Sequence, residues 1–269
     1  MYSQNQIESL KKNGFLIFRK FLNNSELHSV TKKISFFSVN KGHKNAYYAC
    51  NFKSKLIKLL KFQFSQFFTS QLLIRFSKNK NMKELADIIF GKQSFLKMID
   101  SYYSPIDNKE VLPWHVDQAY SGKLDVKDDE LVNPDGYSIK FFIYLTKVGP
   151  NNGCTSYIPE SNKITYAIRK GLKEKKIKYS PHWLLKDLRN FIKKKENLDY
   201  LNNYFNSNTI IKKFLKETDF IEKNIDNKKF DFEMSPGDAI IFDEGGVHKG
   251  SKILFNDRRV LRYHYSIKV

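Results

Sequence analysis

The stretch Trp114-His115-Val116-Asp117-Gln118 carries two metal-capable side chains two residues apart. In an extended strand, residues i and i+2 point to the same face, so His115 and Asp117 can reach one ion from one short strand. An imidazole and a carboxylate are two of the three ligands of the 2-His-1-carboxylate triad that holds Fe(II). His-x-Asp also arises often by chance in solvated loops, so the interpretation depends on a third ligand elsewhere in the chain.

His248 is the candidate third ligand. It comes shortly after Gly245-Gly246, a pair that permits close approach of the backbone, and Arg259 stands eleven residues further on. If Arg259 points inward from the last predicted strand, alternation sends Arg258 and His264 to the opposite face. We therefore expect His264 to be structural or exposed. His28, His43 and His182 have no ligand partners nearby in the sequence.

The elements that must position these residues fall into three groups. Residues 1–94 are predicted to be mainly helical, with a helix over 4–13 that ends at Asn13-Gly14 and a second that Asn24 or Ser25 caps. Residues 95–159 and 230–269 predict a core of short strands, and residues 160–229 a Lys-rich helical insertion. The predicted strands cover 15–22, 95–103, 137–145, 155–159, 230–234, 239–242 and 259–267. Helices followed by many short strands favour one α+β domain, 1–269, with a jelly-roll (double-stranded β-helix, cupin-like) core.

Composition limits the classes of function. Hydrophobic residues make up 41% of the chain, enough for a buried core. The net charge of +19 comes from outside the predicted core, because residues 95–159 carry −3 and residues 230–269 carry zero. Only seven of the 47 basic residues are Arg, which argues against specific nucleic-acid recognition.

The cellular setting follows from three features. No apolar run approaches the ~20 residues of a membrane span. The first residues lack a signal-peptide pattern. The two cysteines form no disulfide framework. We therefore expect a cytoplasmic protein without a membrane partner.

The order His-x-Asp, distal His and following Arg resembles the Fe(II)/2-oxoglutarate oxygenases, and more narrowly the phytanoyl-CoA dioxygenase family. The segments that carry the resemblance are Gly14-Phe15-Leu16-Ile17-Phe18, Asn152-Gly153, Ile158-Pro159-Glu160-Ser161, Pro236-Gly237-Asp238 and His248-Lys249-Gly250-Ser251. Three positions depart from the family pattern: Val116 stands where Gln is frequent, Glu160 where Gly is usual, and Gly250 where Ser is frequent.

The resemblance implies that His115, Asp117 and His248 bind Fe(II). It implies that Arg259 pairs with the distal carboxylate of the co-substrate 2-oxoglutarate, a contact that suits a planar guanidinium, and that Ser251 also touches this co-substrate. O2 would be the oxidant, and ascorbate is expected to stimulate turnover. Retention of Asp117 favours hydroxylation or a related oxidation over halogenation.

Two predicted strands each carry a lysine, Lys97 and Lys140, that can reach the oxoacid carboxylate, although a strand lysine usually extends to solvent.

The implied function is hydroxylation of a small-molecule metabolite with release of succinate and CO2. The Lys-rich segments suit an anionic substrate, and biased composition explains them equally well. We expect residues 160–229 to form a mobile lid over the site. A non-catalytic jelly-roll binding or sensor protein is the alternative, and both a monomer and a homodimer fit the sequence.

Overall fold

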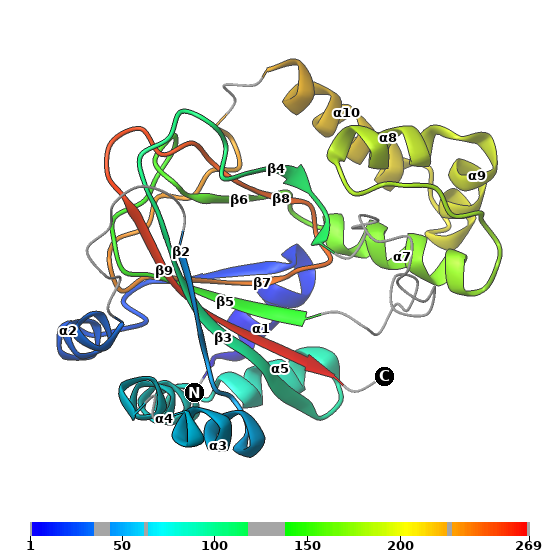
Figure 1. Cartoon of the computed structure of the whole chain (residues 1–269). Helices are drawn as coiled ribbons and strands as arrows, with labels where there is room; N and C mark the ends of the chain where they lie inside the picture. Colours follow the sequence, from blue (N-terminus) through cyan, green and yellow to red (C-terminus); the bar gives the residue numbers. More distant parts are fainter. Residues whose placement is uncertain (1, 35–43, 62–63, 118–137, 225–227, 268–269) are drawn as a thin grey trace.

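The computed structural model describes residues 2–34, 44–61, 64–117, 138–224 and 228–267 (Figure 1). Its helices are α1 (Gln4–Asn13), α2 (Asn24–Lys33), α3 (Phe52–Leu60), α4 (Phe64–Asn79), α5 (Met82–Phe90), α7 (Ser161–Lys173), α8 (Leu185–Lys193), α9 (Lys195–Tyr204) and α10 (Thr209–Lys223). Its strands are β1 (Phe15–Phe18), β2 (Lys44–Tyr48), β3 (Ser94–Ser104), β4 (Leu112–His115), β5 (Ser138–Tyr144), β6 (Thr155–Tyr157), β7 (Ala239–Asp243), β8 (His248–Gly250) and β9 (Arg258–Ile267).

Helix α1 shows how local sequence sets the N-terminal boundaries. Ser3 and Gln6 form a capping box at its start, and Gly14 ends it with φ +83°. A Cβ on Gly14 would lie 2.4 Å from the Tyr157 hydroxyl, so glycine is required here for space as well as for backbone conformation. Helix α2 is capped by Asn23, one residue before the predicted Asn24 or Ser25, because the Asn23 side chain accepts from the Glu26 amide.

The strands form two antiparallel sheets. The larger has the order β1-β7-β5-β9-β3-β2, and the smaller has the order β4-β8-β6. This mixture of helices and antiparallel sheets is consistent with the expected jelly-roll core. The strand predicted over 230–234 is wrong, because Asp231 and Met234 make only isolated bridges, to Ser156 and Val148.

The larger sheet is buried on both faces. Its outer face packs against α1, α4 and α5 through one apolar cluster that includes Phe141 and Tyr263 (Figure 1). Its inner face, meaning the face turned toward the smaller sheet, contributes Tyr144 and Val260 to a second cluster that also contains Tyr157 of β6. Apolar residues therefore occupy both faces, and side-chain polarity alone does not tell the inner face from the outer one.

Helices α7–α10 have an apolar cluster of their own and lie beside the smaller sheet (Figure 1). Three buried residues of the strand region, Val116, Ile158 and Val247, belong to the same cluster. In the part of the chain that the structure describes, no helix is both long and apolar enough to span a membrane.

Candidate metal centre

His115 and His248 face each other across two paired strands. They are register partners in the antiparallel pair β4–β8, and their ring centroids are 4.4 Å apart. His115 is 1% exposed and His248 is 6% exposed. The end of β4 and the start of β8 therefore deliver both imidazoles to one buried point.

Asp117 completes the cluster from just beyond β4. Its Oδ1 lies 3.1 Å from His115 Nε2, and its Oδ2 lies 3.4 Å from His248 Nε2. The three ligand atoms all lie within 4.8 Å of one another, and no other such group is found among the described residues. The structure thus brings together the three residues that the sequence nominated.

The second nitrogen of each imidazole fixes its orientation. His115 Nδ1 donates to the Pro113 carbonyl at 2.6 Å, and His248 Nδ1 donates to the Gly246 carbonyl at 2.8 Å. These bonds select the tautomer that leaves each Nε2 lone pair directed at Asp117. Two imidazole lone pairs and a carboxylate then converge, an arrangement that a divalent cation stabilises. The donor set therefore fits Fe(II).

Lys140 and Glu244 surround the carboxylate. The Lys140 ammonium contacts Asp117 and lies 3.2 Å from Glu244 Oε2. Burial opposes ionisation of Asp117, but the charge of the Lys140 ammonium holds its pKa well below the usual value. Burial lowers the pKa of His248. Asp117 is thus ionised and His248 neutral near pH 7, as metal ligation requires.

Arg258 lies deep between the two sheets, at the end away from the metal cluster. It is 1% exposed, its guanidinium lies 4.9 Å from the Tyr102 ring centroid, and its Nη2 donates to Thr155 Oγ1 at 3.4 Å. Its Nε has no hydrogen-bond partner, and no carboxylate of the described residues pairs with it. A buried guanidinium without a counter-charge is costly unless an anion binds it.

Gly153 explains how this arginine is accommodated. It has φ +74°, and a Cβ there would lie 2.8 Å from Arg258 Cδ. The Asn152-Gly153 turn is therefore needed at this position to leave room for the buried side chain.

The prediction that Arg259 points inward is wrong. Its side chain is 38% exposed and pairs with Asp257 at 2.6 Å. Arg258 and Val260 occupy the inner face instead, whereas Leu261 and Tyr263 pack against the helices. Arg259 was selected by its spacing from His248, and in this fold the side chains that alternate with it on the same face, Leu261 and Tyr263, cover the helices.

The three remaining predicted contacts have different outcomes. Lys97 is exposed at a bulge in β3 between Leu96 and Met98, so its predicted place in the site is wrong. Lys140 faces the metal cluster. Ser251 is buried, and its hydroxyl contacts Cys154 Sγ and the Lys252 carbonyl; its contact with 2-oxoglutarate stays a prediction.

Sequence reasoning missed three residues beside the cluster. Glu244 pairs with Lys140, and the Trp183 ring, from the helical insertion, lies 5.6 Å from His115. His264 was expected to face away from the site. It is instead buried on the inner face, where it is the register partner of Lys140 on the neighbouring strand. No local pattern marks Trp183, whereas the Asp243-Glu244-Gly245-Gly246 loop before His248 was a signal for Glu244.

The sequence model of the phytanoyl-CoA dioxygenase (PhyH) family matches residues 10–260 of this chain. The chain belongs to the PhyH family. The cluster of His115, Asp117 and His248 lies within the matched residues.

Solved structures share the fold of this PhyH protein. One is the epimerase SnoN in complex with Fe3+, alpha-ketoglutarate and nogalamycin RO, at 11% identity and TM-score 0.52, covering 98% of this chain and 82% of SnoN. Another is HygX from Streptomyces hygroscopicus with nickel and 2-oxoglutarate bound, at 13% identity and TM-score 0.52. The match covers 99% of this chain and 87% of HygX. EvdO2 from Micromonospora carbonacea var. aurantiaca has 11% sequence identity and a TM-score of 0.51. The match covers 98% of this chain and 91% of EvdO2. No curated protein sequence matches the chain.

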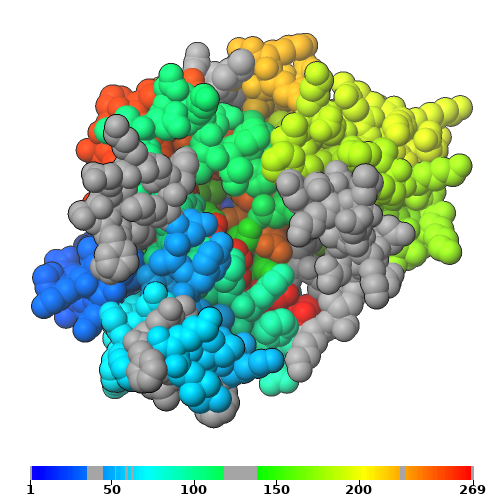
Figure 2. All heavy atoms as spheres, viewed as in Figure 1, coloured from blue at the N-terminus to red at the C-terminus, as the bar shows by residue number. Residues whose placement is uncertain are grey.

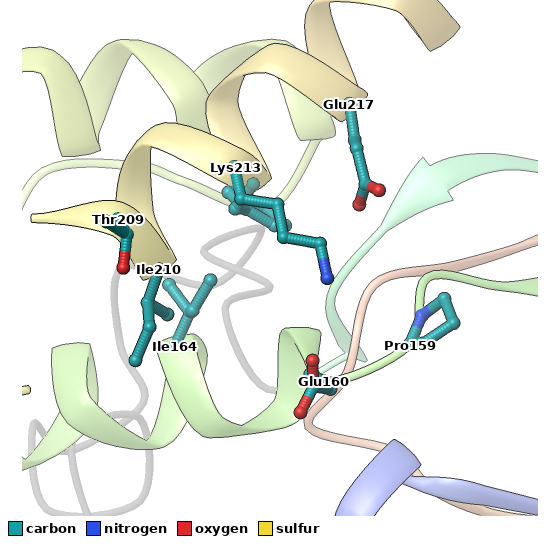
Figure 3. A pocket seen from close by; sticks show the side chains of 8 residues that line it. Pro159, Glu160, Ile164, Thr209, Ile210, Lys213 and Glu217 are labelled. Atoms are coloured by element: carbon teal, nitrogen blue, oxygen red, sulfur yellow. The ribbon is translucent and has the colours of Figure 1, made fainter.

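A surface pocket of about 260 Å³ lies between α7 and α10, away from the cluster (Figure 3). Lys213 points from α10 toward Glu160 at the start of α7. Glu160, which stands where the family usually has Gly, has φ +64°, a region that glycine occupies without strain. The pocket is lined by one lysine and two glutamates but by no histidine. Among the described residues, the one candidate metal cluster is therefore that of His115, Asp117 and His248.

Proposed function

We propose that this PhyH protein is an Fe(II)- and 2-oxoglutarate-dependent dioxygenase that hydroxylates a small-molecule metabolite. The observation that carries the proposal is the convergence of His115 Nε2, His248 Nε2 and Asp117 within 4.8 Å. When bound, Fe(II), O2 and 2-oxoglutarate supply an oxidation that converts 2-oxoglutarate to succinate and CO2. The rest of the site consists of residues that hold and orient the reactants.

Arg258 takes the role of anchor for the distal carboxylate of 2-oxoglutarate in place of Arg259. It lies at the Tyr144 end of β5, since Tyr144 and Arg258 both contact Thr155. Asp117 lies at the Lys140 end of the same strand. Four residues of strand span ~13 Å, which leaves room for an extended five-carbon diacid between the anchor and the metal ligands. Ser251 lies near this anchor through Cys154, the neighbour of Thr155.

Lys140 and Glu244 keep the Asp117 carboxylate in its place. Lys140 is 8% exposed, so its charge acts with little screening on Asp117 and Glu244. Trp183 covers His115 on the side of the insertion, where an aromatic wall excludes water. The insertion over 160–229 is proposed to act as a lid on this side of the site. The cytoplasmic location of the protein stays a prediction.

Two measurements test the proposal. Anaerobic addition of Fe(II) and 2-oxoglutarate to the metal-free protein should produce the visible charge-transfer absorption of an Fe(II)–oxoacid chelate. Exposure to O2 and ascorbate should then release succinate, faster when the substrate is present. Absence of the absorption at saturating Fe(II) and 2-oxoglutarate would contradict the proposal. Absorption without succinate, across a metabolite library, would favour the non-catalytic sensor.

A further inference from the structure

His264 lies on the wall of the site, at the metal end of the space between the sheets. It is the register partner of Lys140 on β5, and partners across antiparallel strands point to the same face. Lys140 contacts Asp117, so His264 faces the same side as the metal ligands. Arg258 is six residues back along β9, which places it roughly 20 Å away along the strand. His264 therefore lies away from the co-substrate anchor.

The His264 imidazole is buried and unsatisfied. It is 6% exposed, and its Nε2 has no hydrogen-bond partner in the part of the chain that the structure describes. Among the described residues, the nearest carboxylate oxygen is Asp100 Oδ1, which is 4.0 Å away and beyond hydrogen-bond distance. A buried polar atom without a partner costs about 1–3 kcal/mol, so such atoms normally have a ligand or a functional reason.

The charges that face His264 keep it neutral. Burial, followed by the charges of Lys140 and Arg262, lowers its pKa well below the usual value. The charge of Asp117 raises the pKa of His264, and the charge of Lys97 lowers it by a smaller amount. A neutral imidazole has one N–H donor and one lone-pair acceptor. In either tautomer, Nε2 can bond to a hydroxyl group, which can both donate and accept.

The two inner-face cations next to His264 already have carboxylate partners. Arg262 makes a two-pronged contact with Asp100, including Nε to Oδ1 at 2.9 Å. Lys140 has Glu244 at 3.2 Å in addition to Asp117. An anionic substrate would have to compete with these pairs, whereas an uncharged polar group would not.

The strand ends beyond His264 continue the polar inner face, where the Glu244 carboxylate accepts a hydrogen bond from the Ser138 amide at 3.0 Å. Ser266 on β9 and Ser138 on β5 are register partners on the inner face, and both are buried. Figure 2 shows a few red atoms, from the C-terminal part of the chain, in the hollow at the centre of this face, above the cyan N-terminal helices.

We propose that His264, with Ser138 and Ser266, forms a substrate subsite for an uncharged, hydroxyl-bearing group on the side of the metal ligands opposite Arg258. The inference rests on the proposed function for the identity of the site as an oxygenase centre. It differs from the sequence-based expectation of an anionic substrate, because the cations beside the subsite are compensated.

The test uses the protein loaded with Zn(II), which is diamagnetic, and 2-oxoglutarate, with ¹⁵N-labelled histidine rings. Two probes share one ring: methyl β-D-glucopyranoside is uncharged, and D-glucuronate carries a carboxylate. The glucoside should shift the His264 ring signals saturably and leave those of the exposed His28 unchanged. Glucuronate should bind at least about tenfold more weakly.

Variants separate a direct contact from a structural effect. His264→Leu should weaken glucoside binding about tenfold, the loss of roughly one hydrogen bond, while His264→Gln, which keeps a donor and an acceptor, should stay within about threefold of the parent. Zn(II) and 2-oxoglutarate affinities should be unchanged in both.

Unmoved His264 signals, equal glucoside affinity in His264→Leu, or a preference for glucuronate would each overturn the subsite. Failure of the unaltered protein to bind Fe(II) and 2-oxoglutarate would instead count against the proposed function alone.

Discussion

Arg258 and Arg259 are adjacent on β9 and lie on opposite faces of the same sheet. Arg258 is 1% exposed between the sheets, whereas the Arg259 side chain is 38% exposed and bonded to Asp257. Alternation in a strand requires opposite faces for neighbours, and the packing of β9 decides which neighbour is inside. Of these two arginines, Arg258 is the one positioned to meet an anion that binds between the sheets.

Replacement of Arg258 should therefore weaken 2-oxoglutarate binding, and replacement of Arg259 should not. A charge-assisted hydrogen bond contributes about 1.5–3 kcal/mol, so Arg258→Gln should raise the Kd roughly 10- to 100-fold. Arg259→Gln, the matched control, should change it less than about twofold, since an exposed ion pair contributes little. The measurement is an anaerobic titration of the Fe(II)-loaded protein. The reverse order of effects would mean that β9 is shifted by one residue.

Loss of a single metal ligand should abolish tight Fe(II) binding. His115→Ala and His248→Ala each remove one of three protein donors, and a decrease in Fe(II) affinity of at least about tenfold is expected. His28→Ala, which changes an exposed histidine on α2, is the control. Equilibrium dialysis with metal analysis gives the affinities. Unchanged binding in His248→Ala would place the third ligand elsewhere.

Asp243 should make stability depend on pH. Burial raises the pKa of this carboxyl from 3.8 to about 6. A raised pKa in the folded state means that the native protein holds this proton more tightly, so its contribution to stability is present at low pH and is lost as pH rises from about 4 to above 6. The loss amounts to at most about 3 kcal/mol.

Asp243→Asn cannot ionise and should escape this loss. The stability of Asp243→Asn relative to the parent should therefore increase between pH 4.5 and 7.5, as measured by urea unfolding of the metal-free proteins. Asp199→Asn, at an exposed position of α9, should show no comparable trend. A relative stability that stays constant across this range would show that Asp243 is ionised at both values.

The sequence predicted those features that depend on local spacing. The convergence of His115 and Asp117 and the helix over 4–13 depend on neighbouring residues, and both agree with the structure, although β4 ends at His115 and Asp117 lies beyond the strand. The face of Arg259 was inverted because its spacing from His248 does not fix which of two neighbouring residues the packing of β9 turns inward. Trp183 reaches His115 through a tertiary contact of the insertion that no periodicity records.

The insertion should become more protected when the metal site is filled. The Val116 amide donates to the Trp183 carbonyl at 2.9 Å, and His115 forms a bridge with Leu184. Ligand stabilises the state that it binds, by about 2.7 kcal/mol at 100 times its Kd. Amides in 112–117 and 183–185 should therefore exchange hydrogen up to ~100-fold more slowly with Fe(II) and 2-oxoglutarate under anaerobic conditions.

Without ligand, α8–α10 should exchange faster than β5, β7 and β9, as expected for a lid whose closure completes the site. Helix α2, which is remote from β4 and β8 in Figure 1, is the internal control and should change little on ligand addition. His248→Ala should remove the ligand effect at 183–185 while leaving the exchange of the ligand-free protein nearly unchanged. If α8–α10 were already as protected as the central strands in the ligand-free protein, the insertion would be a rigid wall of the site and closure would have to come from another segment.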